Sequence, residues 1–217
     1  MREEFVSLGT DNELILPVGI PVREEFYSKI DKNEAKSKLG LPLDKRVILL
    51  MSGSMGCGPI EKTVEAVAAG LPEDCVLVAV CGKNKKLLSN LNKLAKERKN
   101  LRPVGFTKEI SAYMDASELV VTKAGGLSST EAGVKHLPIV FIDAIPGLES
   151  HNRDYFVNRG FAFFAETPEG ISEVINTVIG SDALLCDMRE KMQAEFTHRS
   201  ACEIVDILHE NIHCLRK

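Results

Sequence analysis

The sequence predicts an α/β protein in which a parallel sheet is covered by helices on both faces. Short apolar runs rich in β-branched residues alternate with segments of helical periodicity, and the apolar runs carry no polar face. Strands of this kind are typical of parallel sheets that are buried on both sides. The 217 residues, 44% hydrophobic and 27% charged, are enough for one domain with a sizeable core.

The elements alternate in order along the chain. Each expected strand is an apolar run, such as "ELILPV" or "RVILLMS", and these runs lie at about 13–18, 46–52, 75–81, 101–104, 118–122, 138–142 and 161–164. The segments with helical periodicity lie at about 32–39, 60–69, 84–98, 108–115, 128–135, 149–158, 168–179, 182–194 and 199–213. Ligands of such sheets bind beyond the carboxyl ends of the strands, so the loops that follow strands deserve scrutiny.

Composition excludes several classes of function. The net charge of -4 gives no general attraction to nucleic acid. No apolar run approaches the roughly 18 residues of a spanning helix, and "MREEFVSLGTD" has no signal core, so we expect a cytoplasmic chain. Cysteines without a CxxC pair are predicted to be reduced and mostly buried; they stand at positions 57, 75, 81, 186, 202 and 214.

One short pattern suggests a metal. "HENIH" places His209 and His213 on one helical face, as in H-E-x-x-H zinc proteases. It lies close to the end of the sequence given, where little chain follows to supply a third ligand. We therefore interpret both residues as surface histidines of an amphipathic helix, and no metal site is expected.

The loop "MSGSMGCGPI" (51–60) follows an expected buried strand. Gly53, Ser54 and Gly56 precede a helix that Pro59 opens, so backbone N–H groups there are available to an anion. The order of the glycines fits neither the dinucleotide fingerprint nor a P-loop. Taken alone, the loop leaves a phosphate site and a plain tight turn equally open.

The stretch "VVTKAGGLSSTEAG" (120–133) repeats this device. Gly125 and Gly126 let the chain turn, and a hydroxyl among residues 128–130 is able to cap a helix or donate to an oxygen anion. Glu131 is open to two interpretations. It completes a capping box with Ser128, or it accepts hydrogen bonds from the cis-diol of a ribose. Two glycine-broken turns in one sheet favour a phosphate-bearing ligand.

A third polar group, "DAIPGLESHNRDYF" (143–156), follows the apolar run "PIVFI". It places Glu149 and Asn152 beyond a strand end, where short polar side chains are able to contact sugar hydroxyls. Pro146 and Gly147 are also an ordinary turn signal. Considered alone, this segment favours a plain loop and helix start.

Four ordered segments together resemble a known family. "GIPVREEF" (19–26), "ILLMSGSMGCGPI" (48–60), "VGFTKEISAYMDASELVVTKAGGLSSTEA" (104–132) and "LPIVFIDAIPGLESHN" (137–152) are similar to the C-terminal half of glycosyltransferase family 28. The likeness is greatest to its monogalactosyldiacylglycerol synthase and processive diacylglycerol glucosyltransferase branch. The resemblance implies a Rossmann-like sheet that forms the C-terminal, donor-binding lobe of a GT-B enzyme, which transfers a hexose from UDP-hexose to a lipid such as diacylglycerol.

The resemblance also implies a role for individual residues. Arg23 matches an arginine that contacts the diphosphate. The phosphate-loop positions are Gly53, Ser54 and Gly56 in the first loop, and Gly125, Gly126, Leu127 and Ser128 in the second. Phe106 and Thr107 match the segment whose backbone contacts uracil, and Glu131 matches the acid that binds ribose. Glu149 and Asn152 match the segment beside the sugar, in which Leu148 replaces the usual glutamine and leaves the hexose unassigned.

The resemblance covers nearly the whole chain. It implies a donor domain over residues 1–217 with C-terminal helices at about 182–213, and an absent N-terminal acceptor lobe. The general base belongs to that lobe, so no catalytic residue is named, and neither metal nor cofactor is expected. A non-catalytic nucleotide-sugar subunit or sensor, completed by a separate acceptor protein, is the alternative. A UDP-GlcNAc 2-epimerase is less favoured, because those enzymes carry their own acid and histidine sets.

The segment 83–102 carries eight Lys or Arg and one Glu around a leucine stripe. Helices of this kind are able to bind an anionic membrane, which suits a lipid-glycosylating enzyme. We favour a helix that covers the sheet with a solvated outer face, because the leucines have a core to pack against.

Overall fold

The computed structural model describes residues 2–51, 60–142 and 147–215. The chain forms two compact units. One unit combines the two ends of the sequence given, Met1–Val22 and His198–Lys217, and the other is the continuous segment Arg23–Thr197. The second unit contains the sheet and every predicted ligand-binding loop.

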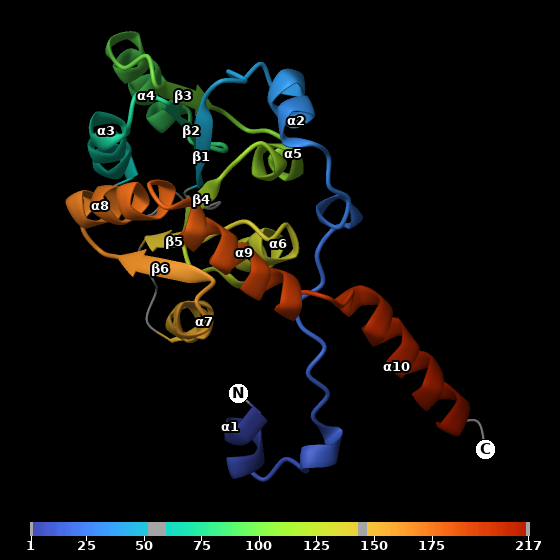
Figure 1. Cartoon of the computed structure of the whole chain (residues 1–217). Coiled ribbons are helices and arrows are strands. Elements are labelled where there is room, and N and C mark those ends of the chain that lie inside the picture. Colours follow the sequence, from blue (N-terminus) through green and yellow to red (C-terminus); the bar gives the residue numbers. More distant parts are fainter. Residues whose placement is uncertain (1, 52–59, 143–146, 216–217) are drawn as a thin grey trace. The chain divides into compact units, whose positions relative to one another are not determined.

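The sheet has six parallel strands in the order β3-β2-β1-β4-β5-β6 (Figure 1). The strands are β1 (Arg46–Met51), β2 (Cys75–Val80), β3 (Leu101–Val104), β4 (Leu119–Thr122), β5 (Ile139–Ile142) and β6 (Ala162–Ala165). The chain moves outward from β1 to β3 and then returns to the centre at β4. The order therefore reverses between β1 and β4, which is the place where Rossmann-type sheets bind ligands.

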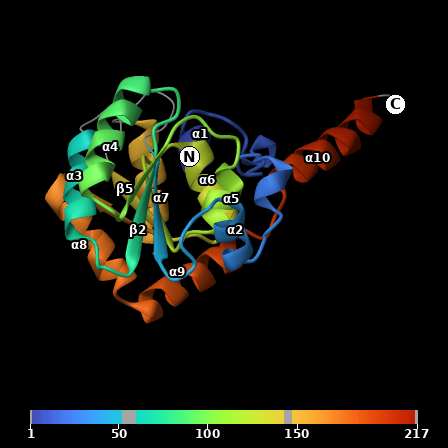
Figure 2. The ribbon, with the colours of Figure 1, turned by 90° about the horizontal axis from the view of Figure 1, so that it is seen from above.

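Helices cover both faces of this sheet, as predicted (Figures 1 and 2). α3 (Ile60–Gly70), α4 (Lys85–Glu97) and α8 (Pro168–Ile179) lie on one face. α5 (Ile110–Asp115) and α6 (Gly126–Val134) lie on the other. The remaining elements of this unit are η2 (Glu24–Phe26), α2 (Lys32–Lys38), α7 (Leu148–Asn158) and α9 (Asp182–Glu195).

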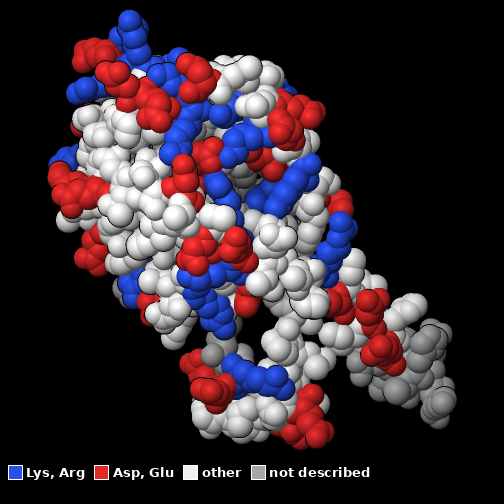
Figure 3. Space-filling view, viewed as in Figure 1, with Lys and Arg blue, Asp and Glu red and all other residues white. Residues whose placement is uncertain are grey.

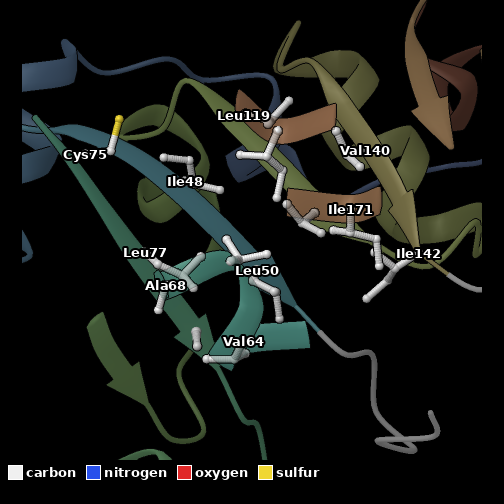
Figure 4. Close-up of a cluster of buried hydrophobic side chains, with 14 of the residues drawn as sticks. Ile48, Leu50, Val64, Ala68, Cys75, Leu77, Leu119, Val140, Ile142 and Ile171 are labelled. Carbon is white, nitrogen blue, oxygen red and sulfur yellow. The ribbon is translucent and has the colours of Figure 1, made fainter. Parts of the chain in front are cut away.

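The core explains why the strands lack a polar face. Successive side chains of a strand point to opposite faces, and both faces here are covered. In Figure 4, Ile48 and Leu50 of β1 lie with Leu77 of β2 and Val64 of α3 in one cluster. The alternate residues Val47 and Leu49 are also buried. Each strand is therefore apolar along its whole length.

α4 shows how the leucine stripe of the basic segment is buried. Leu87 and Leu91 are buried, and Leu88 and Leu94 pack against the same core from partly exposed positions. The helix begins at the N-cap Asn84, whose side chain accepts a hydrogen bond from the backbone N–H of Leu87 at 2.9 Å. The predicted sheet-covering helix is confirmed.

The strand predicted at 13–18 is wrong. The segment contains the short turn η1 (Asn12–Leu14) and continues as irregular chain between α1 (Arg2–Ser7) and Arg23. Its side chains Leu14 and Leu16 are more than half exposed. β-Propensity reflects packing and pairing rather than an intrinsic preference, and this segment pairs with no strand of the sheet.

The C-terminal helix α10 (Ser200–Leu215) belongs to the same unit as this segment. Leu16, Pro17 and Val18 line a groove whose other wall is formed by Glu203, Asp206, Ile207 and Glu210 of α10. Part of the segment that suggested a strand therefore faces a helix across a groove. His209 is exposed on α10, and the side chain of His213 lies outside the described residues.

The cysteine prediction holds in part. Cys75 and Cys81 are free and buried, and burial raises the pKa of both thiols to about 11. Cys186 and Cys202 are free but exposed, because they lie on the outer faces of α9 and α10. Cys57 and the side chain of Cys214 lie outside the described residues.

The end of α9 packs closely on α6. A methyl group at Gly133 of α6 would overlap the ring of Phe196, the C-cap of α9. Phe196 also contacts the rings of Phe156 and Phe161, with centroids 5.8 and 5.7 Å away. Glycine is therefore used at position 133 for space, in a helix where alanine is normally the better residue by about 1 kcal/mol.

We expect Gly133→Ala to lower the free energy of unfolding by about 1–3 kcal/mol, because the new methyl group forces the ring of Phe196 away. Urea denaturation measures this change. In a Phe196→Ala background the ring is gone, so the same substitution should stabilise by about 0.5–1 kcal/mol. The same sign in both backgrounds would contradict the packing argument.

Candidate functional site

The strands that precede the two glycine-broken loops lie side by side at the centre of the sheet. β1 pairs with β4 in parallel, with Ile48 opposite Leu119 and Leu50 opposite Val121. The two strands therefore end at the same edge of the sheet, at the point where the strand order reverses. The first loop, with Gly53, Ser54 and Gly56, lies outside the described residues. The second can be described in full.

α6 begins at the second loop with an open N-terminus. Its N-cap is Gly125, which has no side chain to accept a hydrogen bond from the first turn. The first backbone bond runs from the N–H of Ser129 to the carbonyl of Gly125 at 3.1 Å. The N–H groups of residues 126–128 therefore have no partner within the helix. Such groups, together with the helix dipole, favour a phosphate.

The start of α6 corrects two predictions. The helix begins at Gly126 rather than residue 128, so Ser128 is not an N-cap, and the capping box with Glu131 is wrong. The hydroxyls of Ser129 and Thr130 donate to the carbonyls of Gly125 and Gly126, both at 2.8 Å. Both hydroxyls therefore bond to the backbone of their own helix. Ser128 is the hydroxyl-bearing residue of the first turn that is left for a ligand.

Glu131 is buried on α6, with 8% of its surface exposed. Burial raises the pKa of its carboxyl to about 7; the positive charge of Arg23 opposes this shift and the negative charge of Glu25 adds to it. Charged groups are rarely buried unless a partner compensates them. A carboxylate held this way is suited to a ligand that brings hydrogen-bond donors.

Arg23 supplies a cation near this carboxylate. It precedes η2 and has an exposed side chain that pairs with Glu25, with 3.0 Å between Nη2 and Oε1. Its guanidinium lies 5.2 Å from the centre of the Phe26 ring, and Phe26 is fully buried. A buried ring thus supports the arginine from one side and leaves its donors accessible.

Glu149 and Asn152 of α7 converge on the loop before α6. The side-chain amide of Asn152 donates to the carbonyl of Ala124 at 3.2 Å. Oε1 of Glu149 would lie 4.0 Å from a methyl group at Gly125. The structure therefore brings the third polar segment to the second glycine loop, although 24 residues or more separate them in sequence. Leu148 begins α7.

Phe106 and Thr107 follow β3, at the edge of the sheet. The Phe106 ring is 64% exposed, and Nζ of Lys83 lies 5.8 Å from its centre. Oγ1 of Thr107 accepts a hydrogen bond from the N–H of Glu109 at 3.0 Å. Two strands, β2 and β1, separate β3 from β4, and both β3 and β4 end at the same edge of the sheet.

Two residues near the site were not singled out from the sequence. Glu25 acts on the pKa of Glu131, and Lys83 lies over Phe106. The position of Lys83 was the available signal, because it follows β2 directly at the ligand-binding edge. Within the described ranges no group of three or more His, Cys, Asp or Glu is placed to hold a metal ion.

The family follows from a match that covers most of the chain. The family model for the glycosyltransferase family 28 C-terminal domain matches residues 47–204. The chain belongs to glycosyltransferase family 28. This family 28 domain is 30% identical over 218 residues to a processive diacylglycerol beta-glucosyltransferase of Staphylococcus saprophyticus, covering 98% of the chain and 56% of that protein. The chain thus spans about half the length of the curated relatives it matches.

Solved structures agree on the fold of the family 28 domain. The complex of Staphylococcus aureus MnaA with UDP matches with a TM-score of 0.69 at 19% identity, covering 88% of this chain and 52% of that one. HepE of Anabaena in complex with UDP and glucose matches with a TM-score of 0.66 at 20% identity. The match covers 96% of this chain and 60% of that one. The fold is therefore the C-terminal lobe of the GT-B architecture, as predicted.

Proposed function

We propose that this family 28 domain is the donor-binding lobe of an enzyme that transfers a hexose from UDP-hexose to a lipid hydroxyl, such as that of diacylglycerol. The observation that carries the proposal is the uncapped N-terminus of α6 beside β1, with the buried carboxyl of Glu131 on the same helix. The similarity to a processive diacylglycerol beta-glucosyltransferase supports a diacylglycerol acceptor, and the UDP complexes of MnaA and HepE support a UDP donor.

Each part of the donor would meet a different group. The free N–H groups of α6 and the guanidinium of Arg23 would hold the diphosphate, and Glu131 would accept hydrogen bonds from the ribose diol. Gly53, Ser54 and Gly56 would complete the phosphate site. Leu127 and Ser128 would flank it. The backbone of Phe106 and Thr107 would contact uracil, and Glu149 and Asn152 the sugar.

The reaction needs positive charge where the leaving group forms. The acceptor oxygen bonds to C1 of the hexose, the bond from C1 to the diphosphate oxygen breaks, and the hydroxyl proton passes to a base outside this chain. α6 and Arg23 would stabilise the departing UDP. We propose that neither a metal nor a cofactor takes part, because α6 and Arg23 supply the positive charge that the leaving group needs.

The lipid acceptor sets the place of the reaction. In the part of the chain that the structure describes, no helix is long and apolar enough to cross a membrane. We propose that the protein acts peripherally at the cytoplasmic face of a membrane, where a water-borne donor and a lipid acceptor meet.

Calorimetric titration tests the proposed ligand. We expect the chain to bind UDP and at least one of UDP-glucose, UDP-galactose and UDP-GlcNAc more tightly than ATP or NAD, because the ribose acid and diphosphate site are expected beside a uracil-specific segment. Tighter binding of ATP or NAD would overturn the proposal. Comparison of the three UDP-sugars would also assign the hexose.

A further inference from the structure

α4 presents a cationic face that the donor site does not use. With 3.6 residues per turn, Lys85 and Lys96 lie three turns apart on one side of the helix, and Lys86 and Lys93 lie two turns apart beside them. All four side chains are exposed. We call these four residues the α4 lysine face.

The α4 lysine face points away from the core. Leu87 and Leu91, on the opposite side of the helix, are buried against the sheet. Figure 3 shows Lys and Arg side chains, interspersed with some carboxylates, over the part of the surface that α4 occupies in Figure 1. Arg98, Lys99 and Arg102 extend the charge beyond the helix, and all three are exposed.

Few anions offset this charge. No ion pair joins the α4 lysine face to any other residue that the structure describes, whereas the exposed Lys38 and Lys191 pair with Glu109 and Asp187. Within α4 the single acid is Glu97. From the neighbouring helix, Glu61 accepts a hydrogen bond from the side-chain amide of Asn90 at 3.2 Å.

We propose that the α4 lysine face attaches the protein to an anionic lipid surface by charge alone. Clusters of four or more Lys or Arg on an amphipathic helix are typical of anionic-lipid binding. Insertion of the apolar side is excluded, because the leucines that would enter the bilayer are buried in the core. The attachment is therefore reversible and sensitive to salt.

The chemistry of the face favours lipid over other anionic partners. The basic residues within α4 are all lysines, which act as hydrated point charges, whereas arginine is the residue suited to bidentate recognition. The helix has no aromatic side chain on which a nucleobase would stack. Its exposed residues besides the lysines are Ser89, Asn92 and Glu97, so it lacks the apolar anchor of a protein interface.

The position of the face suits a lipid substrate. α4 follows β2 at the carboxyl edge of the sheet, the same edge at which α6 begins. Attachment near Lys85 and Lys86 would bring the donor site toward the bilayer. This step rests on the proposed function, since it assumes that the acceptor is a lipid.

Sedimentation with vesicles tests the proposal. We expect the full chain to bind vesicles of phosphatidylglycerol and phosphatidylcholine in about 0.1 M salt, and to leave them in about 1 M salt, where the Debye length falls to about 3 Å. Each lysine near the surface contributes about fivefold to binding, so Lys93→Gln with Lys96→Gln should weaken it about 25-fold. Lys38→Gln with Lys191→Gln is the charge-matched control and should bind as the parent does.

Several results would overturn the assignment. An equal loss in both double variants would indicate net charge rather than this face, and binding to vesicles of phosphatidylcholine alone would indicate apolar contact. Displacement from the vesicles by a small amount of polyuridylate would indicate a nucleic-acid surface. UDP titration of the same samples distinguishes this proposal from the proposed function. Absence of vesicle binding with intact UDP binding would refute the role of α4 and leave the donor site unaffected.

Discussion

Glu131→Gln is expected to lower the affinity for UDP about tenfold or more. A carboxylate that accepts hydrogen bonds from the ribose diol makes charge-assisted bonds worth about 1.5–3 kcal/mol, and an amide makes weaker ones. The capping-box role that would have spared this substitution is excluded, because α6 begins at Gly126. Calorimetric titration measures the change, with pyrophosphate as a ligand that lacks the diol and should bind the variant normally.

The burial of Glu131 adds a pH dependence with a definite sign. The carboxyl has a pKa of about 7 in the free protein, so the carboxylate that binds the diol forms as the pH rises from 6 to 8. Affinity for UDP-glucose should rise over this range in the parent and stay level in Glu131→Gln. UDP-glucose is the better probe here, because its diphosphate lacks the terminal phosphate proton that titrates near pH 6.

Stability should change in the opposite direction. Between pH 4.5 and 7 the folded chain holds the Glu131 proton that the unfolded chain releases, so stability falls as the pH rises through this window. Glu131→Gln removes this loss and should raise the free energy of unfolding at pH 8 by up to about 3 kcal/mol. At pH 4.5 it should change little.

Glu173→Gln, on the exposed face of α8, is the matched control and should alter neither property. The ribose role of Glu131 is lost if the glutamine variant binds UDP as well as the parent. It is also lost if affinity falls only together with the stability of the ligand-free protein.

Lys135→Met is expected to lower the free energy of unfolding by about 3–5 kcal/mol. Nζ of Lys135 donates to Oδ2 of Asp115 at 2.7 Å and to the carbonyl of Ser28 at 2.6 Å. The two charged side chains are only 1% and 6% exposed. Removal of the lysine leaves a buried carboxylate without its cation, which is far more costly than loss of the pair as a whole. Urea denaturation measures the effect.

Two further variants make this prediction specific. Lys135→Met combined with Asp115→Leu should recover most of the lost stability, since no unpaired charge remains buried. Lys191→Met breaks the exposed pair with Asp187, in which both side chains are about half exposed, and should cost 1 kcal/mol or less. If Lys135→Met cost no more than Lys191→Met, burial of the pair would not contribute to stability.

The fold could be predicted because its signals are local. Apolar runs such as Val47–Leu50 and Val120–Val121 mark strands buried on both faces, and six of them form the sheet. The run at 13–18 has the same composition but pairs with no strand of the sheet. Six residues alone do not determine whether a segment finds a strand to pair with. Whether a run joins a sheet depends on the rest of the chain.

The candidate site was predicted less completely. The glycines at 125 and 126 indicated a turn, but they do not reveal where the helix starts, because glycine serves both as an N-cap and within a first turn. The position of Glu131 was visible in the sequence, whereas its burial and raised pKa depend on neighbours such as Arg23 that lie far away in sequence. Lys135 and Asp115 are 20 residues apart with no periodic signal between them.

The smaller unit combines two segments that are far apart in sequence, and this affects the order in which the chain folds during synthesis. Residues up to Val22 leave the ribosome long before the helix that completes their unit, which begins at Ser200. The intervening segment Arg23–Thr197 can form its sheet while the early residues wait, since its strands and helices contact one another. Leu16 and Val18 therefore remain without the helix that forms the other wall of their groove until α10 has been made, and this is the interval in which a chaperone would have most to protect.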